Sequence, residues 1–567
     1  MVDFIYRGTS TDSEDKLLER LLHPQSGIIA VDTETISLTN TGCIGIGVAV
    51  SPTDTYYVPL YPERSPILSQ AYQLLVRKDL TKIWHNGNFD IQVLSVLGKD
   101  EGYSPIDLWN MHDTSIMAQV QGLQPDLHGL GNNLLHDYDL FEISDLLDEA
   151  RESTGRKHVT MLDVDPERVA QKCCNDVRTT FNLLPVLVGR LSQRTQDCYE
   201  VDRRLTGWLK VIEGRGLKLN HEKIDEYYQK LAMQMMVIED AADELGFSIS
   251  SNQQLGMYLA NNKIVLPLTK SGRQLDTSED VLRTINHPIA QMALEYRKLQ
   301  KANGTYIEPS LHADRQYSHF RLDLATGRLA SKGLGCDFHR CTNQQNVPPE
   351  LRDMYTPDNG TFTWADMSQL EMRVFAHFTQ DTTLLDIYRN DKSVHETTFR
   401  ALYPNLTYDK SIPEYTKAKT ANFAMIFDAN DETIANQCGV SKQVASQWKR
   451  IWFETYPEAR LWMQQQQSTN SVYEETLFGR RMLIPKDRGY HHANTCRINY
   501  PIQGSGADLN KRALLYIMEH VKGEDIRLQV HDEVVNDGDI DLPMKEISNL
   551  YPNLEIPWEV KKGKIWT

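Results

Sequence analysis

Two short acidic segments late in the chain carry residue types that could hold a metal ion. Residues 361–373 begin with alternating β-branched and aromatic residues, which predict a strand that ends at Asp366. Residues 527–535 place Asp532 and Glu533 between two apolar, β-rich halves, a pattern typical of a hairpin with the acids at its turn. A single acid at a strand end is more often a cap or turn residue. The two segments together favour a site for a hard cation, which prefers carboxylate ligands.

A second group of acids occupies the first 180 residues. Residues 27–35 predict a buried strand, and its alternation places Asp32 and Glu34 on the same face. Asp90 follows a predicted strand and turn, and Asp176 lies in a helical segment. Four carboxylates placed in this way can hold two divalent ions, which activate a water and stabilise the leaving oxygen in phosphodiester cleavage. On the residues alone, solvated acids at strand ends remain the alternative.

A third pattern lies in residues 412–427, where Tyr415, Lys419, Phe423 and Phe427 recur every four residues and so share one face of a predicted helix. A face that served only packing would not carry a lysine at its centre. A cation suited to a triphosphate, beside aromatic rings suited to a sugar and a base, explains the mixture better. This face therefore predicts a nucleotide-binding surface.

The elements that position these residues need more than one domain. A chain of 567 residues is too long for one core, so two to four domains are expected. Hydrophobic residues make up 40% and charged residues 24%, as in ordinary globular proteins, and no apolar run approaches the ~20 residues of a membrane span. The first residues show no targeting pattern, which predicts a cytoplasmic location. Eight cysteines without repeated Cys-x-x-Cys spacing favour reduced thiols over a disulfide scaffold.

The net charge of −17 argues weakly against a nucleic acid partner. Net charge is a poor guide for a large chain, because a local basic groove can act within an acidic whole. Clustered metal-binding carboxylates also contribute to the negative total. If the chain binds DNA, the binding is expected to depend strongly on salt.

The patterns resemble motifs of the DNA polymerase I family (family A). The two acidic segments resemble motif A, D-Y-S-Q-I-E-L-R, and motif C, V-H-D-E, and the lysine-centred face resembles motif B, R-x-x-x-K-x-x-x-F-x-x-x-Y-G. The early acids, in the order D-x-E, H-N-x-x-F-D and D-x-x-x-T, are similar to a DEDD-type 3′→5′ exonuclease. Further matches are T-G-R-L-A-S at 326–331, Q-N-V-P at 345–348, N-Y-P-I-Q-G at 499–504 and G-K-I-W at 563–566.

The resemblance covers roughly residues 25–567 and implies a multidomain α/β fold. A ribonuclease H-like exonuclease domain would be followed by a right-hand polymerase with thumb, palm and fingers. The implied boundaries are 1–190 for the exonuclease domain, 191–320 for the thumb and linking helices, 321–380 for the first part of the palm, 381–490 for the fingers, and 491–567 for the second part of the palm.

The implied function is a DNA-directed DNA polymerase with 3′→5′ proofreading, acting in DNA replication. Asp366 and Asp532 would hold two Mg²⁺ with a carbonyl near Met367, Glu533 would support them, and Lys419 would neutralise phosphate charge. The nucleotide-binding residues implied are Glu371, Gln369, His395, Lys419, Phe423, Tyr415 and Phe427, and Glu371 would act as a steric gate against ribonucleotides. The DNA-binding residues implied are Arg328, Gln345, Asn346, Arg373, Asn499, Gln503 and His531. The implied exonuclease residues are Asp32, Glu34, Asp90 and Asp176, which would hold two divalent ions, together with Lys172.

Further basic residues suit phosphate contacts. Lys270 and Arg273 lie in a Gly-containing loop of the thumb region, where they could position DNA without reading its sequence. Lys511 and Arg512 follow the N-Y-P-I-Q-G segment and are interpreted as phosphate contacts or as solvated residues.

The chain departs from the family pattern at several places. Lys172 stands where a tyrosine is usual, which predicts weak proofreading with metal binding less affected than cleavage. Tyr415 replaces an arginine and Phe427 a tyrosine, so nucleotide affinity and fidelity are expected to differ. An insertion carries Cys336, His339 and Cys341, for which a loop is favoured over zinc because a structural zinc site uses four ligands.

The exonuclease pattern begins by residue 28, so the 5′-nuclease domain found in bacterial members of the family is expected to be absent. This feature and the divergent motifs predict a phage-encoded replicative enzyme that acts in the host cytoplasm. The partners expected are primer–template DNA and dNTPs, with helicase, primase and single-strand binding protein as further candidates, no membrane, and a monomeric state. Two alternatives stay open: an exonuclease with a degenerate polymerase module, and a non-enzymatic DNA-binding scaffold of the replisome.

Overall fold

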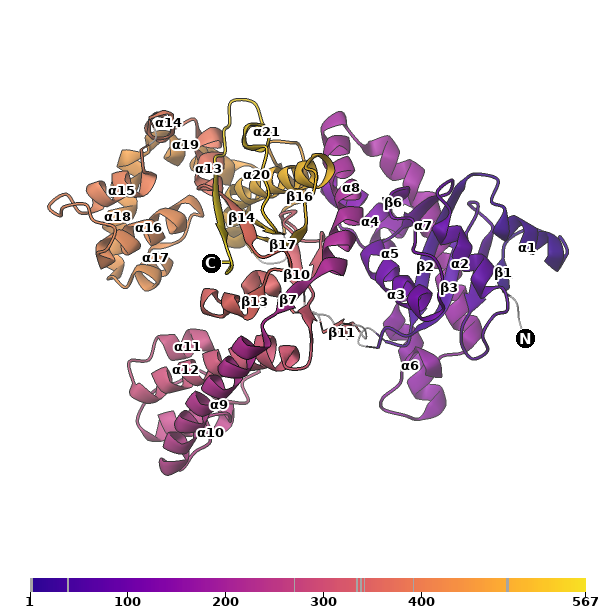
Figure 1. Ribbon diagram of the computed structural model, residues 1–567, viewed down its shortest axis with the longest axis horizontal. Coiled ribbons are helices and arrows are strands. Elements are labelled where there is room, and N and C mark those ends of the chain that lie inside the picture. The colour runs from indigo at the N-terminus through magenta and orange to yellow at the C-terminus, as the bar shows by residue number, and fades with distance from the viewer. Residues whose placement is uncertain are drawn as a thin grey trace.

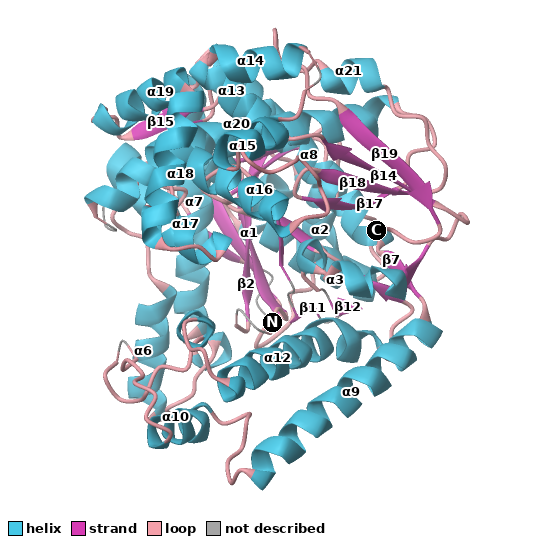
Figure 2. Ribbon diagram, turned by 90° about the vertical axis from the view of Figure 1, so that its left-hand side faces the viewer, coloured by secondary structure: helices cyan, strands magenta, loops and turns pink. Residues whose placement is uncertain are grey.

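The computed structural model describes residues 4–37, 40–269, 271–332, 335–336, 339–340, 342–390, 392–485 and 489–567. Figure 1 shows an N-terminal α/β domain on the right, a central sheet, a helical group on the left and a second helical group below. Figure 2 shows the lower group, with α9 (His221–Glu244) and α12 (Pro288–Ala302), extending away from the central sheet. The arrangement agrees with the expected α/β multidomain fold.

The N-terminal domain is built on a six-stranded sheet in the order β1-β4-β3-β2-β5-β6. The pairs β1–β4, β4–β3 and β3–β2 are antiparallel, while β2–β5 and β5–β6 are parallel. A short edge strand opens the domain and precedes its first helix. The strands are β1 (Ile5–Arg7), β2 (Ile28–Thr35), β3 (Cys43–Ala49), β4 (Thr55–Pro59), β5 (Thr81–Trp84) and β6 (Met111–Asp113).

Two helices of this domain carry acids to the sheet. The long helix α7 (Pro166–Arg190) begins with Pro166 after the Asp165 cap and packs across β2, β3 and β4. The helix α3 (Gly87–Asp100) places Asp90 in its first turn rather than at a strand end, because β5 stops at Trp84. The remaining helices are α1 (Glu14–Leu22), α2 (Leu68–Val76), α4 (Thr114–Val120), α5 (Leu127–Leu130) and α6 (Ile143–Thr154).

The lower group of helices has its own small hydrophobic core, formed by residues such as Leu255, Leu282 and Tyr296. It comprises α9, α10 (Asn252–Asn261), α11 (Glu279–Arg283) and α12. The predicted phosphate contact Lys270 lies outside the described residues, and Arg273 is exposed. The short strands β7 (Leu217–Leu219), β8 (Arg315–Gln316) and β13 (Tyr355–Thr356) form a small sheet at the base of this group.

The central sheet has the order β17-β18-β14-β19, all antiparallel. The strand predicted to end at Asp366 is β14 (Phe362–Met367). The hairpin predicted around Asp532 is confirmed and consists of β17 (Ile526–Val530) and β18 (Glu533–Asp537). The sheet is completed by β19 (Trp558–Gly563). The helices α13 (Leu370–Thr379) and α20 (Tyr490–His520) lie against each other beside it, and α21 (Met544–Ser548) contacts α20.

The left-hand group contains six helices in the described part of the chain. They are α14 (Thr382–Arg389), α15 (Val394–Leu402), α16 (Pro413–Ile426), α17 (Asp431–Cys438), α18 (Lys442–Thr455) and α19 (Pro457–Ser468). The predicted lysine-centred face lies on α16, with Phe427 directly after its last residue. Two-stranded ribbons elsewhere are β9–β10 (His319–Arg321, Ala330–Lys332), β11–β12 (Gly335–Cys336, His339–Arg340) and β15–β16 (Tyr473–Glu475, Arg481–Leu483).

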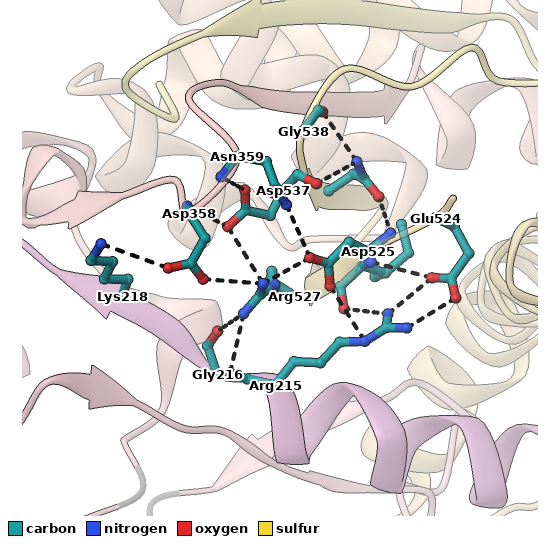
Figure 3. A network of polar contacts seen from close by, with 12 residues as sticks. Arg215, Gly216, Lys218, Asp358, Asn359, Glu524, Asp525, Arg527, Asp537 and Gly538 are labelled. Atoms are coloured by element: carbon teal, nitrogen blue, oxygen red, sulfur yellow. Dashed lines mark hydrogen bonds and ion pairs between the residues drawn. The ribbon is translucent and has the colours of Figure 1, made fainter. Parts of the chain in front are cut away.

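A polar network fixes the end of the β17–β18 hairpin that lies away from its turn (Figure 3). Arg527 on β17 contacts Asp525 at 2.7 Å and Asp358 at 3.1 Å, and donates to the Gly216 carbonyl at 3.0 Å. The Asp537 carboxylate on β18 accepts from the backbone amides of residues 358 and 359, both at 2.8 Å. The network therefore ties the hairpin to the loop before β14 and to the end of helix α8 (Gln193–Arg215).

A buried cluster of charges joins α8 to α20. Arg480 contacts Asp202 on α8 at 2.7 Å and Asp508 on α20 at 2.7 Å, and Lys511 contacts Asp202 at 2.9 Å. All four side chains are at most 3% exposed. The interpretation of Lys511 as a phosphate contact or solvated residue is therefore wrong, because its ammonium is the buried partner of Asp202. Arg512 instead stacks over the Phe478 ring.

Three expectations about the chain as a whole concern its cysteines, a zinc site and membrane-spanning helices. Cys43, Cys173, Cys174, Cys198, Cys438 and Cys496 are free thiols, as predicted. The candidate zinc ligands Cys336, His339 and Cys341 lie outside the residues whose side chains are described. Within the described ranges, none of the helices combines the length and apolar character needed to cross a membrane.

We expect Asp202→Ala to destabilise the protein strongly, because it leaves the buried Arg480 and Lys511 opposite a single carboxylate. Breaking a buried charge pair costs about 3–5 kcal/mol. The measurement is calorimetric unfolding of the full chain. The matched control is Glu279→Ala, which removes an exposed helical ion pair with Arg283 and should leave the transition almost unchanged. Equal shifts for the two variants would contradict the assignment.

Candidate catalytic centres

The first candidate centre lies at the edge of the central sheet, where β14 meets the hairpin turn. Asp366 pairs in register with Glu533 on β18 and with Glu559 on β19. The backbone amide of Met367 donates to the Asp532 carbonyl at 3.1 Å. The predicted residues Asp366, Met367, Asp532 and Glu533 are thus brought together by strand pairing.

The crowding of acids perturbs their ionisation. Burial, followed by the charges of Asp532, Glu533 and Glu559, raises the pKa of Asp366 to about 7. Burial also raises the pKa of Asp532 and of Glu533. Half-buried carboxylates that repel one another are stabilised in their charged form by a hard cation, so this donor set suits a divalent metal ion.

The three acids of this centre differ in their partners. Glu533 accepts a hydrogen bond from the Trp566 indole at 2.6 Å, which leaves it less free than the aspartates to bind a metal ion. Within the described ranges, one trio of potential metal ligands has atoms mutually within 4.8 Å of one another. It consists of Asp32, Glu34 and Cys173 in the N-terminal domain and not of the palm acids. The arrangement therefore suits Asp366 and Asp532 as ligands and Glu533 as a supporting acid.

Gln345 lies beneath the turn rather than on the surface. Its amide accepts from the Ser331 backbone at 2.7 Å and donates to the Gln529 side chain at 2.9 Å. Gln529 in turn donates to the carbonyl of His531. These bonds bury Gln345, and its implied contact with DNA stays a prediction. Gln345 supports the turn that carries Asp532, whereas His531 and Asn346 are exposed.

Glu371 lies on α13 just beyond the β14 strand end. Its carboxylate forms an ion pair with Arg328, which brings two predicted residues from separate motifs together. The loop before Arg328 is tightly placed, because a Cβ at Gly327 (φ 72°) would lie 2.9 Å from the Arg480 side chain. The buried charge cluster therefore helps to position Arg328.

Gln369 and Arg373 flank the start of α13. Gln369 has a left-handed backbone with φ 53° and accepts a hydrogen bond from the Tyr388 hydroxyl at 3.3 Å. The Arg373 guanidinium stacks over the Tyr388 ring at 4.4 Å. Tyr388 on α14 thus links both predicted residues to the left-hand helical group.

His395 on α15 has a defined tautomer. Asn422 accepts at Oδ1 from the Trp452 indole at 2.7 Å, so its amide nitrogen faces His395 Nδ1 at 3.2 Å. An indole N–H can only donate, so Nδ1 of His395 must accept and Nε2 carries the proton. Burial, then the charge of Lys419, lowers the pKa of His395 to about 4. The neutral imidazole of His395, which can donate from Nε2, and the exposed ammonium of Lys419 therefore lie near each other.

The aromatic residues of the α16 face have different surroundings. The Phe423 ring lies 5.6 Å from that of His395, and the Tyr415 ring 5.8 Å from that of Tyr408. A cavity of about 420 Å³ beside Phe423 and Phe427 also contacts α20 at residues 491 and 495. The arrangement leaves room for a flat ring system beside the phenyl groups.

Asp428 shows how the chain tolerates a departure from motif B, which has glycine at this position. Its φ of 53° lies in the left-handed region that favours glycine. Gln467 donates to the Asp428 carboxylate at 2.6 Å, and Lys449 contacts it at 3.4 Å. The side chain thus gains two partners in a conformation that costs an ordinary residue free energy.

The remaining predicted DNA contacts lie on α20. Asn499 and Gln503 are half-buried and one helical turn apart, on the helix that packs against α13. The Asn499 side-chain oxygen is buried and has no hydrogen-bond partner. No described contact brings either residue to the metal-binding acids.

The second candidate centre lies in the N-terminal domain, where β2, α3 and α7 meet. Asp32 and Glu34 come from β2, Asp90 from α3 and Asp176 from α7. The amide and hydroxyl of Thr33 donate to the Asp90 carboxylate at 3.0 and 2.6 Å, a contact that the sequence did not indicate. Burial, opposed by these hydrogen bonds, raises the pKa of Asp90 to about 7. The elements β2, α3 and α7 therefore bring the four predicted acids into one centre.

The electrostatics of this centre are dominated by Lys172. Its ammonium lies 2.9 Å from Glu34 and 2.7 Å from Asp176. Burial opposes its charge, but Asp176, Glu34 and Asp32 outweigh that effect and raise the pKa of Lys172 well above its usual value. Burial and the other acids raise the pKa of Asp32. The other Asp176 oxygen, Oδ1, is buried without a hydrogen-bond partner, which suits a bound cation.

Two protein-family models match the chain, one over its N-terminal domain and one over most of the remainder. Residues 220–554 match the model of DNA polymerase family A, and residues 8–187 match a 3′-5′ exonuclease model. The chain belongs to DNA polymerase family A. A thermostable DNA polymerase I from Thermus filiformis is 29% identical over 70% of this chain and 50% of its own length. DNA polymerase I of Borreliella burgdorferi is 26% identical over 99% of this chain and 64% of its own length.

The chain thus spans about half to two thirds of the length of these relatives. A solved structure described as the POL domain of Pol1 from M. smegmatis in complex with DNA primer-template and dNTP superposes with a TM-score of 0.75 at 19% identity. It covers 98% of this chain and 99% of its own. The fold is therefore that of an N-terminal exonuclease domain followed by a polymerase domain.

We expect His395 to titrate near pH 4 and to stay neutral at pH 7, because burial and Lys419 oppose its charged form. A histidine in the unfolded chain titrates near 6.5, so between these values the unfolded state binds a proton that the folded state does not. This histidine therefore reduces folding stability as the pH falls from about 6.5 towards 4. The measurement is NMR of ¹⁵N-histidine-labelled protein, assigned with His395→Gln. An ordinary pKa, or a proton on Nδ1 at pH 7, would contradict the tautomer deduced above.

Proposed function

We propose that the protein is a DNA-directed DNA polymerase with an associated 3′→5′ exonuclease. The observation that carries the proposal is the pairing of β14 with β18, which brings Asp366 beside Asp532. The cationic and aromatic face of α16 offers the complementary nucleotide surface. Family membership supports the same reading. Primer–template DNA and dNTPs are the proposed substrates.

In this proposal the palm acids Asp366 and Asp532 hold two divalent cations, with Mg²⁺ as the natural candidate. When bound, such ions lower the pKa of the primer 3′-hydroxyl and carry charge on the triphosphate. The protein's own groups position the substrates and neutralise charge. Lys419 offers its ammonium to the triphosphate, and His395 offers a neutral Nε2–H donor that does not depend on pH near 7.

Two residues are proposed to control the sugar and the primer end. Glu371 would occupy the space that a ribose 2′-hydroxyl needs, and its ion pair with Arg328 holds it in one orientation. Arg328 could reach the minor groove, where acceptors are nearly the same for every base pair. The ion pair couples the check on the sugar to the check on the primer terminus.

For the N-terminal domain we propose proofreading of mismatched primer ends. The four carboxylates gathered by β2, α3 and α7 support phosphodiester cleavage, while Lys172 in the place of the usual tyrosine supports a slow reaction. Helicase, primase, single-strand binding protein, a monomeric state and a cytoplasmic location remain proposals. The expected phage origin has no support from the relatives named above, which are bacterial proteins.

We expect Asp366→Ala to abolish primer extension, by at least three orders of magnitude, and to leave excision of a mismatched primer end intact. The physical reason is that one of two carboxylates holding the catalytic ions is lost. The measurement is extension and excision on the same labelled primer–template with Mg²⁺ and dNTPs. The matched control is Asp32→Ala with Glu34→Ala, which should show the opposite pattern.

These assays also separate the alternatives. Excision without extension by the unsubstituted chain would favour an exonuclease with a degenerate polymerase. DNA binding with neither reaction would favour a scaffold. Retained extension by Asp366→Ala would refute the assignment of the palm centre.

We expect the unsubstituted chain to incorporate dideoxynucleotides poorly and Phe423→Tyr to improve their incorporation about tenfold or more, corresponding to about 1.4 kcal/mol in transition-state free energy. The reason is that a tyrosine hydroxyl on this face can replace a contact that a normal 3′-hydroxyl supplies. The ratio of kcat/KM for dideoxy- and deoxynucleotides measures the effect. Phe427→Tyr, on the same face but one turn further on, serves as the control. An unchanged ratio in Phe423→Tyr would remove Phe423 from the sugar site.

A further inference from the structure

Lys172 fills a position within the exonuclease acids that a cation would otherwise take. Its side chain is 7% exposed, and its ammonium contacts Glu34 Oε1 at 2.9 Å and Asp176 Oδ2 at 2.7 Å. These are charge-assisted distances between full charges. A divalent ion would bind such oxygens at about 2.0–2.6 Å. The ammonium therefore competes with a divalent ion for these two oxygens.

The backbone holds Lys172 in this place. Lys172 and Asp176 are four residues apart on α7 and lie on one face of the helix. The helix is pressed against the sheet, because a Cβ at Gly47 on β3 would lie 2.6 Å from the Cys173 sulfur and 3.0 Å from a Val177 methyl group. This close approach of α7 to β3 fixes the backbone from which the Lys172 side chain reaches Glu34 and Asp176.

Asp32 and Asp90, the other two acids of this centre, have no such cationic partner among the described residues. Across the described residues, no lysine or arginine lies within ion-pair distance of Asp32 or Asp90. Within the described ranges, Asp32 accepts one weak contact, from the Cys173 thiol at 3.8 Å, and Asp176 Oδ1 is buried without a partner. Asp32 and Glu34 each offer an oxygen within 4.8 Å of the other and of the Cys173 sulfur, which suits one divalent cation beside the Lys172 ammonium.

We propose that the exonuclease centre of this chain binds one divalent cation, and that Lys172 takes the charge position of a second. This inference rests on the proposed exonuclease function of the domain. It revises the expectation that replacement of the usual tyrosine would affect metal binding little, because the ammonium competes directly for Glu34 and Asp176. Lys172 is then a fixed part of the centre.

The test counts Mn²⁺ ions bound to the full chain by electron paramagnetic resonance. All samples carry Asp366→Ala and Asp532→Ala, so that the palm centre does not contribute. A further sample with Asp32→Asn and Glu34→Gln gives the background to subtract. We expect one Mn²⁺ in the exonuclease centre with Lys172, one with Lys172→Arg, and two with Lys172→Met, which removes the charge but keeps a long side chain.

Two ions in the centre with Lys172 present, no ion at all, or equal counts for Lys172→Met and Lys172→Arg would overturn the proposal. The first count needs no substitution at Lys172, so misfolding of a Lys172 variant cannot obscure it. Excision of a mismatched primer by the chain with an intact palm is measured separately. If one ion binds and nothing is excised, proofreading is refuted and the one-ion centre stands.

Discussion

The pairing of β14 with its two neighbours is the constraint on which the polymerase centre depends. A slip of one residue would turn Asp366 to the opposite face of the sheet, away from Asp532. The register is held at both ends. The Arg527 and Asp537 network fixes one end of the hairpin (Figure 3), and the Met367 amide with the Gln345–Gln529 contact fixes the turn. The helices α13 and α20 then place side chains beside an edge of the central sheet whose position the strands already fix.

The two centres handle crowded carboxylates in different ways. In the palm, Asp366, Asp532 and Glu533 have raised pKa values because burial and mutual repulsion oppose their charges. No described lysine or arginine lies within ion-pair distance of these three acids. In the N-terminal domain, a lysine of the chain itself neutralises two of four acids. The exonuclease centre is thus partly neutralised by the chain itself, whereas the three palm acids are not.

Much of this could be predicted from local patterns. The alternation before Asp366 and the split apolar run around Asp532 predict the strand and the hairpin, and the structure confirms both. The sequence could not show which buried polar groups meet across long separations. The resemblance to the family motif implies a DNA contact for Gln345 but does not indicate its buried hydrogen bond to Gln529. The sequence around Lys511 allows a phosphate contact or a solvated residue, whereas the structure pairs it with Asp202, over 300 residues away. The roles of the site residues in catalysis stay predictions.

The charge cluster between α8 and α20 has a consequence for how the chain can be divided. The family A match begins at residue 220, after α8 has ended at Arg215. A polymerase fragment cut at that point would lose Asp202 and leave the Arg480 guanidinium and the Lys511 ammonium sharing Asp508 alone. It would also release the side chain that packs against Gly327 and so helps to place Arg328. The smallest self-sufficient polymerase fragment should therefore start before residue 193, so that the helix after the exonuclease domain belongs physically to the polymerase.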